Sequence, residues 1–149
     1  MRRGATLLAL LALLATGCRD EPTLEQQIIS AVTEMERYAE EGLRADFMSM
    51  VHEDFLGQDG TLNRDSFRLY MIMQWNEHQR LYAQLFPIRV SSLGEGQARA
   101  AFRALITGGR GLVPDSGELF EISTFWVHAD GDWKLLKADW DPVLGEEIF

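Results

Sequence analysis

The spacing of apolar residues changes once along this chain, and the change constrains the fold more than any other feature. Over residues 24–83, apolar side chains recur mainly every three or four positions, which is typical of helices that bury one face. Over residues 85–140 they alternate with polar side chains, which is typical of strands. Helices followed by consecutive strands predict an α+β domain, with the helices packed on one face of a sheet.

Three helices are predicted in the first half. Thr23 begins a capping box ahead of the first helix. Asp46 can cap a second, shorter helix that continues to Phe55. Asn63 can cap a third helix over about residues 64–83, which begins with apolar residues on every side and is therefore expected to be buried on more than one side.

Four strands are predicted in the second half, over residues 85–92, 97–107, 118–128 and 132–140. Between the last two strands, an Asp-Gly pair is typical of a two-residue hairpin. Consecutive antiparallel strands of this kind form a meander. The chain is therefore predicted to pack three N-terminal helices in the concave face of a curved, four-stranded, mainly antiparallel sheet.

The N-terminal segment has the order of a lipoprotein signal. Two arginines precede an apolar run from Ala5 to Ala15, which closes on small residues before Cys18, the only cysteine. The run is shorter than the ~20 residues that a membrane-spanning helix needs. We predict a signal peptide over residues 1–17, lipidation of Cys18, and a lipidated tether over residues 18–22. An ordinary signal peptide cleaved near Gly17 is the alternative.

Lipidation of Cys18 would attach the domain to a membrane through acyl chains. Arg19 follows the cysteine in place of aspartate, which by resemblance to enterobacterial lipoproteins favours the outer membrane, with the domain facing the periplasm. Loss of residues 1–17 removes two arginines and no acidic residue, so the formal charge changes from −9 to −11. A chain this acidic disfavours nucleic acid as a partner.

Three local features accompany the order of the elements. A helical segment runs into Glu53-Asp54-Phe55, a Gly-Gln-Asp-Gly turn precedes the third helix, and the closing strand carries Trp133 and Trp140. Together they resemble the nuclear transport factor 2-like superfamily, and more narrowly its small bacterial lipoproteins. The resemblance covers residues 23–143 and leaves residues 144–149 as a C-terminal tail. It implies a cone-shaped half-barrel with an internal pocket, which often dimerises through the sheet.

The superfamily includes isomerases, cyclases, dehydratases and proteins that only bind, so the resemblance leaves the chemistry open. An isomerase would need a carboxylate such as Asp139 in a dry pocket, and a dehydratase would need a histidine such as His78 beside an aspartate. Strand alternation places Asp139 opposite the core side chains. The consecutive His52, Glu53 and Asp54 diverge around a helix and make a poor metal site. The sequence therefore assigns no catalytic residue, metal or cofactor.

The remaining candidates for a site are mainly aromatic. Core packing is their simpler role, and lining an apolar pocket is the functional one. We predict that the domain binds a small apolar ligand, or an envelope partner, without catalysis. An isomerase, cyclase or dehydratase is the alternative, and a structural homodimer through the sheet is a third hypothesis. The pocket-lining candidates are Trp75, His78, Phe102, Arg103, Trp126 and Trp140.

Overall fold

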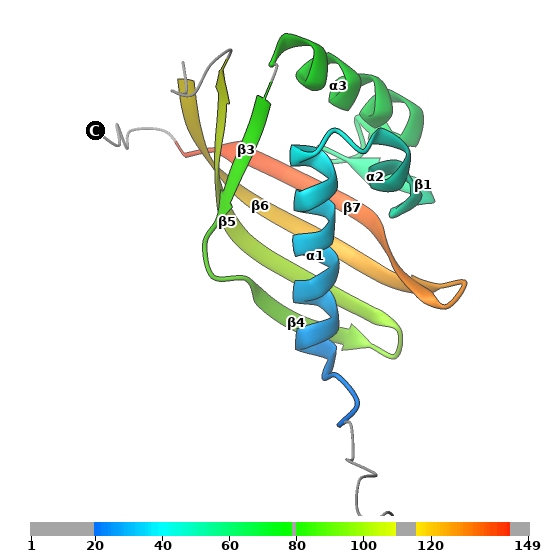
Figure 1. Ribbon diagram of the computed structural model, residues 1–149. Coiled ribbons are helices and arrows are strands. Elements are labelled where there is room, and N and C mark those ends of the chain that lie inside the picture. Colours follow the sequence, from blue (N-terminus) through cyan, green and yellow to red (C-terminus); the bar gives the residue numbers. More distant parts are fainter. Residues whose placement is uncertain (1–19, 79, 110–115, 144–149) are drawn as a thin grey trace, which may run out of the picture.

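The computed structural model describes residues 20–78, 80–109 and 116–143 (Figure 1). The predicted signal peptide, Cys18 and the predicted tail lie outside these residues. Within them, none of the helices has the length and apolar character required to cross a membrane.

The first half of the chain forms three helices: α1 (Leu24–Glu40), α2 (Arg44–Ser49) and α3 (Arg64–Glu77). The predicted capping box of α1 is present. The Thr23 hydroxyl accepts from the Gln26 N–H at 3.2 Å, and the Gln26 side chain accepts from the Thr23 N–H at 2.9 Å. Asn63 caps α3, as predicted, because its side chain accepts from the Ser66 N–H at 2.9 Å. These caps satisfy backbone donors that the first turn of a helix leaves free.

The segment after α2 is a strand, and the prediction that the second helix continues to Phe55 is wrong. β1 (Val51–Gly57) pairs with β2 (Leu62–Asn63) and, in parallel, with β7 (Asp132–Pro142). The pairing with β7 shifts register inside β1, and residues four apart, Val51 and Phe55, are both buried. Because this spacing also suits a helix, periodicity could not distinguish the two. α2 begins at Arg44, so Asp46 lies in its first turn rather than at its cap.

The third helix is also shorter than predicted, and the strand that follows it is divided. α3 ends at Glu77, while β3 (Arg80–Leu85) and β4 (Arg89–Gly94) pair with different parts of β5 (Gln97–Gly109). Pro87 lies between β3 and β4, where its missing N–H removes no ladder bond. The tertiary pairing with β5 therefore decides the conformation of residues 80–85.

One curved, open sheet contains all seven strands, in the order β2-β1-β7-β6-β5-β3 with β4 beside β5. The long antiparallel centre is formed by β5, β6 (Ser116–Ala129) and β7. Asp130 and Gly131, with φ of 55° and 85°, form the predicted hairpin. The predicted α+β class and curved sheet are confirmed, but the described sheet has seven strands rather than four.

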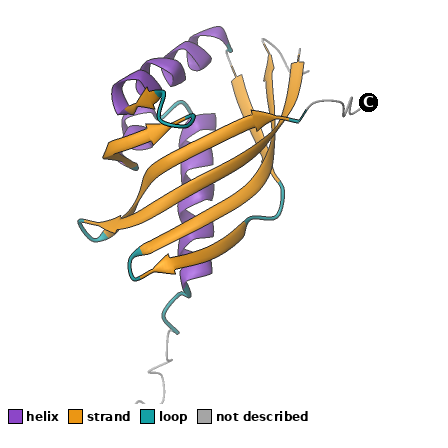
Figure 2. Cartoon of the chain, turned by 180° about the vertical axis from the view of Figure 1, so that it is seen from behind, coloured by secondary structure: helices purple, strands orange, loops and turns teal. Residues whose placement is uncertain are grey.

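The core lies between α1 and one face of the sheet. Figure 1 shows α1 lying across the central strands, and Figure 2 shows the opposite face without a described helix over it. From α1 the core receives Ile28 and Val32, and from the sheet Ala98, Ala100 and Trp126. The two alanines carry only a methyl group, which lets a helix lie close to β5. Further along the sheet, where the side chains are larger, a space between the helices and the sheet remains unfilled.

Candidate functional site

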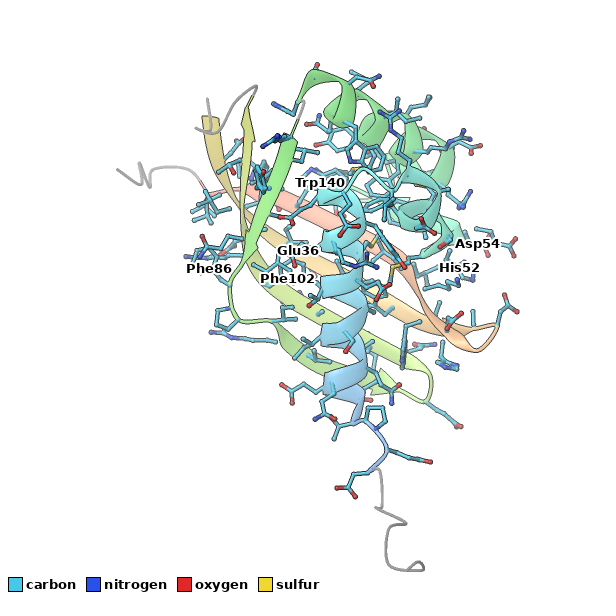
Figure 3. The ribbon with its side chains drawn as sticks, in the orientation of Figure 1. Glu36, His52, Asp54, Phe86, Phe102 and Trp140 are labelled. Carbon is cyan, nitrogen blue, oxygen red and sulfur yellow. The ribbon has the colours of Figure 1, made fainter. Side chains whose placement is uncertain are left out.

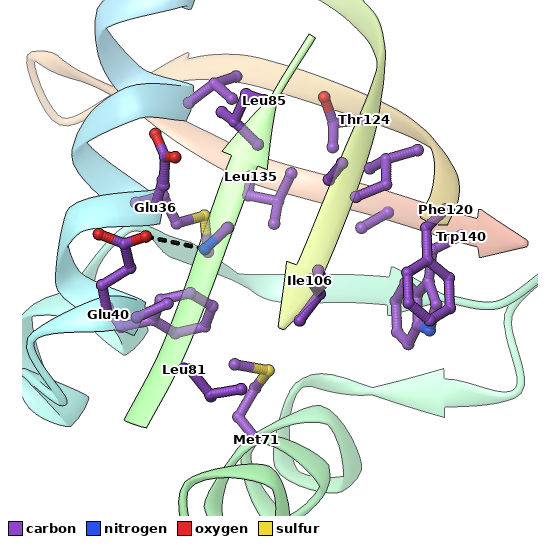
Figure 4. A pocket seen from close by; sticks show the side chains of 18 of the residues that line it. Glu36, Glu40, Met71, Leu81, Leu85, Ile106, Phe120, Thr124, Leu135 and Trp140 are labelled. Atoms are coloured by element: carbon purple, nitrogen blue, oxygen red, sulfur yellow. Dashed lines mark hydrogen bonds between the residues drawn. The ribbon is translucent and has the colours of Figure 1, made fainter. Parts of the chain in front are cut away.

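The unfilled space is a cavity of about 240 Å³ between α1, α3 and the inner face of the sheet (Figure 4). Strand alternation turns Phe102, Ala104 and Ile106 of β5 toward it, while Leu81, Ala83 and Leu85 of β3 close one side. Sites for drug-sized ligands usually measure about 300–1,000 Å³. The cavity therefore suits a molecule smaller than a typical drug-sized ligand.

The lining is mostly apolar. About three quarters of its side chains are aliphatic or aromatic and carry no carboxyl, amide or hydroxyl group. Because most of the lining is apolar, the main part of any bound molecule must also be apolar. A polar molecule would lose its hydrogen bonds to water on entering the cavity. The exceptions in the lining are Glu36, Glu40, Tyr70, Gln74, Tyr82 and Thr124.

The Thr124 hydroxyl is already occupied by the protein. It donates to the Ala100 carbonyl at 3.1 Å and accepts from Trp126 Nε1 at 2.9 Å. Both Thr124 and Trp126 are buried. This pair of bonds satisfies the side-chain polar groups of Thr124 and Trp126 within the protein, so neither of these residues offers an unbonded donor to the cavity.

Glu40 covers an open edge of the sheet. β3 pairs with β5 on one side only, and the Ala83 N–H on its other side donates to Glu40 Oε1 at 2.8 Å (Figure 4). Exposed strand edges favour pairing with other chains, and a charged side chain placed on one prevents it. Glu40 is thus a structural residue as well as a lining residue.

Glu36 lies one helical turn before Glu40 and has no such partner. It is half-buried, and no hydrogen bond or ion pair to it is found among the described residues. Burial and, to a smaller extent, the charge of Glu40 raise the pKa of the Glu36 carboxyl above its usual value of 4.5. Figure 3 shows Glu36, Phe102 and Trp140 near the space between α1 and the sheet.

Two aromatic rings face each other at the opposite part of the lining. Tyr70 of α3 and Trp140 of β7 have ring centroids 5.5 Å apart with an interplanar angle of 35°. Burial is the main cause that raises the pKa of the Tyr70 hydroxyl, and a side-chain hydrogen bond with Trp140 opposes the shift. The pair supplies a flat apolar surface with one hydroxyl donor.

The structure places three of the six residues proposed from the sequence at the cavity. Phe102, Trp126 and Trp140 line it. Trp75 is outside the lining and packs in the core, where its Nε1 donates to the Ala39 carbonyl at 2.8 Å. His78 is also outside, beyond the end of α3 and against Gly108, where its ring occupies the space that a Cβ would need.

Arg103 lies on the other face of the sheet, which corrects its expected place at the pocket. Its guanidinium pairs with Glu121 at 3.0 Å, directly across the β5–β6 ladder. The alternation of β5 explains the difference, because Phe102 and its neighbour Arg103 must point to opposite faces. On β5, the lining positions Phe102, Ala104 and Ile106 alternate with positions that face away from the cavity.

The other candidates for chemistry also lie away from the cavity. Asp139 Oδ1 accepts from the Asp59 N–H at 2.8 Å and holds the turn after β1 to β7. His52 and Asp54 lie on β1, away from the labelled cavity residues in Figure 3. Within residues 20–78, 80–109 and 116–143, no three His, Cys, Asp or Glu side chains are grouped so that they could hold a metal ion.

Comparisons with known proteins rest on the structure. No protein-family model matches the sequence, and no curated protein matches it. A proposed dehydratase of the NTF2-like family from Streptomyces avermitilis superposes with a TM-score of 0.71 at 16% identity, over 81% of this chain and 97% of that one. The chain has the nuclear transport factor 2-like fold.

Two further solved structures share this NTF2-like fold. The CamKII hub homology domain of Chlamydomonas reinhardtii superposes with a TM-score of 0.68 at 14% identity, over 81% of this chain and 99% of that one. Bd1075 of Bdellovibrio bacteriovorus superposes with a TM-score of 0.67 at 11% identity, over 81% of this chain. The match spans 41% of the Bd1075 chain.

Glu36 and Glu40 are the site residues of this NTF2-like domain that sequence reasoning missed. Neither residue was among the pocket-lining candidates selected from the sequence. The signal was present, because Glu36 follows Val32 by four positions and precedes Ala39 by three, so it borders the apolar face of α1. Only the position of β3 shows that this border faces a cavity.

Proposed function

We propose that this domain binds a small, mainly apolar molecule in the cavity between α1, α3 and the sheet, without catalysis. The observation that carries the proposal is the composition of the lining, which is apolar except at six positions. On the sheet wall, the hydroxyl of Thr124 and the indole N–H of Trp126 are already bonded within the protein. A concave apolar site with few polar groups is the usual form of a small-molecule site.

Titration with 1-octanol, an uncharged molecule of suitable size, tests the proposal. Trp126 and Trp140 line the cavity, so binding is expected to change the tryptophan fluorescence in a saturable way. Calorimetry supplies an independent measurement. Saturation should be absent after Ala104→Phe, because Ala104 is buried on the cavity wall and the larger ring fills the space.

Ala101→Phe is the matched control, since Ala101 lies on the same strand but on its other face. This variant should bind 1-octanol as the unmodified protein does. Ile106→Trp, at a second lining position, separates filling of the cavity from a folding defect, and circular dichroism checks both variants. Equal binding by the unmodified protein and by both folded, cavity-filled variants would overturn the proposal.

We also propose that the domain is held at the periplasmic face of the bacterial outer membrane by lipid on Cys18. The proposal rests on the signal-like order of residues 1–18. The full chain expressed in a bacterium should be found in the membrane fraction, and detergent should release it. A Cys18→Ala chain should leave that fraction. Membrane association of Cys18→Ala equal to that of the unmodified chain would contradict the proposal.

A homodimer through the face of the sheet opposite α1 is a further part of the proposal. One support is that the CamKII hub homology domain, whose name describes a hub, shares this fold. The other is that no described helix covers this face of the sheet (Figure 2). Light scattering during size-exclusion chromatography should give the mass of a dimer. A monomer at all concentrations would contradict this part and leave the binding proposal intact.

One observation favours catalysis as a second candidate. Glu36 is a half-buried carboxyl at the cavity, and burial, with a smaller contribution from Glu40, raises its pKa above 4.5, which makes its carboxylate a stronger base than an exposed one. Incubation of a small ketone with the protein in D₂O would reveal exchange at the carbon next to the carbonyl. Exchange that is abolished by Glu36→Gln would favour an isomerase-type reaction over simple binding.

A further inference from the structure

The charged groups of the cavity all have one sign. Among the residues that the structure describes, its lining contains two carboxylates, Glu36 and Glu40, and no lysine, arginine or histidine. Both carboxylates come from α1, one turn apart, and lie beside β3 (Figure 4). The remainder of the lining is apolar or uncharged, so the cavity has an acidic end and an apolar body.

The two carboxylates differ in how the protein satisfies them. Glu40 is exposed and accepts the edge N–H of Ala83. Glu36 is half-buried and has no hydrogen bond or ion pair with the described part of the chain. The basic residue nearest in sequence, Arg37, pairs instead with Glu34 at 3.1 Å and Glu41 at 3.2 Å. A partly desolvated carboxylate without a partner is unfavourable, and a bound cation would stabilise it.

We propose that the ligand of this cavity is a small amphiphile with a cationic end, such as an alkylammonium, whose nitrogen lies at Glu36 and Glu40 while its chain lies against the apolar wall. The inference rests on the proposed binding function and adds the class of ligand to it. An alkylammonium donates three hydrogen bonds and can contact both carboxylates at once. A fatty acid of the same length would place its carboxylate beside two like charges and is disfavoured.

Three probes of equal length test the inference at pH 7: 1-octylamine, 1-octanol and octanoate, each below its aggregation concentration. Octylamine should bind about tenfold more tightly than octanol, as expected for a hydrogen bond between charged groups. Octanoate should bind more weakly than octanol. Calorimetry and tryptophan fluorescence should give the same order.

Two variants separate a contact at Glu36 from general attraction to an acidic protein. Glu36→Gln should reduce the preference for octylamine over octanol by about tenfold, through weaker binding of octylamine. Glu25→Gln changes the net charge equally, at an exposed position in the first turn of α1 outside the lining, and should leave the preference intact. Glu40→Gln keeps an oxygen that can accept from Ala83 and should reduce the preference without loss of stability.

The results distinguish failure of the inference from failure of the binding proposal. If octanol does not bind, the cavity is not a ligand site and both fail. If octanol binds and octylamine binds no more tightly, only the cationic class is overturned. The same conclusion follows if Glu36→Gln and Glu25→Gln reduce octylamine binding equally.

Discussion

Replacement of Thr124 by valine is expected to lower the free energy of unfolding by about 2 kcal/mol, through loss of a buried hydrogen-bonding group. Valine has nearly the shape of threonine, so the change removes the hydroxyl with little change in packing. Thr124 is 5% exposed, and its hydroxyl joins Trp126 Nε1 at 2.9 Å to the Ala100 carbonyl at 3.1 Å. Without it, the indole N–H of Trp126, itself 2% exposed, loses its bonded acceptor.

The magnitude follows from the number of groups affected. A net hydrogen bond contributes about 1 kcal/mol, and a buried donor left unsatisfied costs about 1–3 kcal/mol. The Ala100 carbonyl has a second lone pair, so the orphaned indole N–H is the larger part of the cost. Thr124→Ser keeps the hydroxyl and loses one methyl group, with an expected cost of about 0.8 kcal/mol.

Urea unfolding followed by circular dichroism measures these differences, and a double-mutant cycle identifies their source. Trp126→Phe removes the N–H, so Thr124→Val should cost about 1 kcal/mol less in that background than in the unmodified protein. Two results would refute the reasoning. One is a cost for Thr124→Val within about 0.5 kcal/mol of zero, which is the usual range of neutral surface changes. The other is an equal cost in both backgrounds.

Three further predictions concern stability. Gly57→Ala should lower the free energy of unfolding by about 1–3 kcal/mol in urea titrations, because a Cβ at Gly57 would lie 3.1 Å from the Phe55 ring and 3.2 Å from the Ala138 carbonyl oxygen. No loss would mean that the ring moves freely. Asn63→Ala should cost about 1 kcal/mol through loss of the cap of α3, whereas Asn63→Asp should stay near the unmodified value. Burial and the charge of Glu40 raise the folded-state pKa of Glu36 above 4.5. The folded protein is therefore more stable at low pH, where Glu36 is protonated. This stability is lost as the pH rises from about 4.5 through the higher folded-state pKa. Glu36→Gln should remove this loss, so its Tm relative to the unmodified protein should increase between pH 4 and pH 7; a difference that does not change with pH would contradict the assignment.

The parts of the fold that were predictable from sequence depend on local interactions. The caps at Thr23 and Asn63 and the hairpin at Asp130 and Gly131 involve residues within three positions of one another, and the structure has all three. The alternation over residues 97–140 also identified the three long strands, because period-two burial along a strand depends mainly on the strand itself.

The errors occur where a distant segment decides the conformation. Residues 51–57 pair with β7, and residues 80–85 pair with β5, although both segments were predicted mainly as helix. Val51 and Phe55 are four positions apart, which suits a helix face as well as a bulged strand. Whether this segment becomes a helix or a strand depends on whether a strand edge is available for pairing. The residues around Val51 and Phe55 do not indicate where such an edge lies.

The candidate site shows the same division. Of the aromatic candidates, Phe102, Trp126 and Trp140 line the cavity and Trp75 does not, whereas Arg103 was assigned to the same side as its neighbour Phe102 against strand parity. Glu36 could not be selected from the sequence, because a position at the edge of the apolar face of α1 indicates a cavity-lining residue only when β3 lies opposite it.

The sequence by itself determined the α+β class, the caps of α1 and α3, the hairpin and the acidic character of the chain, since each follows from the residues of one segment or from composition. Only the tertiary structure decided the seven-stranded order, the open edge that Glu40 covers and the cavity that Glu36 borders. The physical reason is that an edge or a cavity belongs to several segments at once, and its properties follow from how they are placed in space.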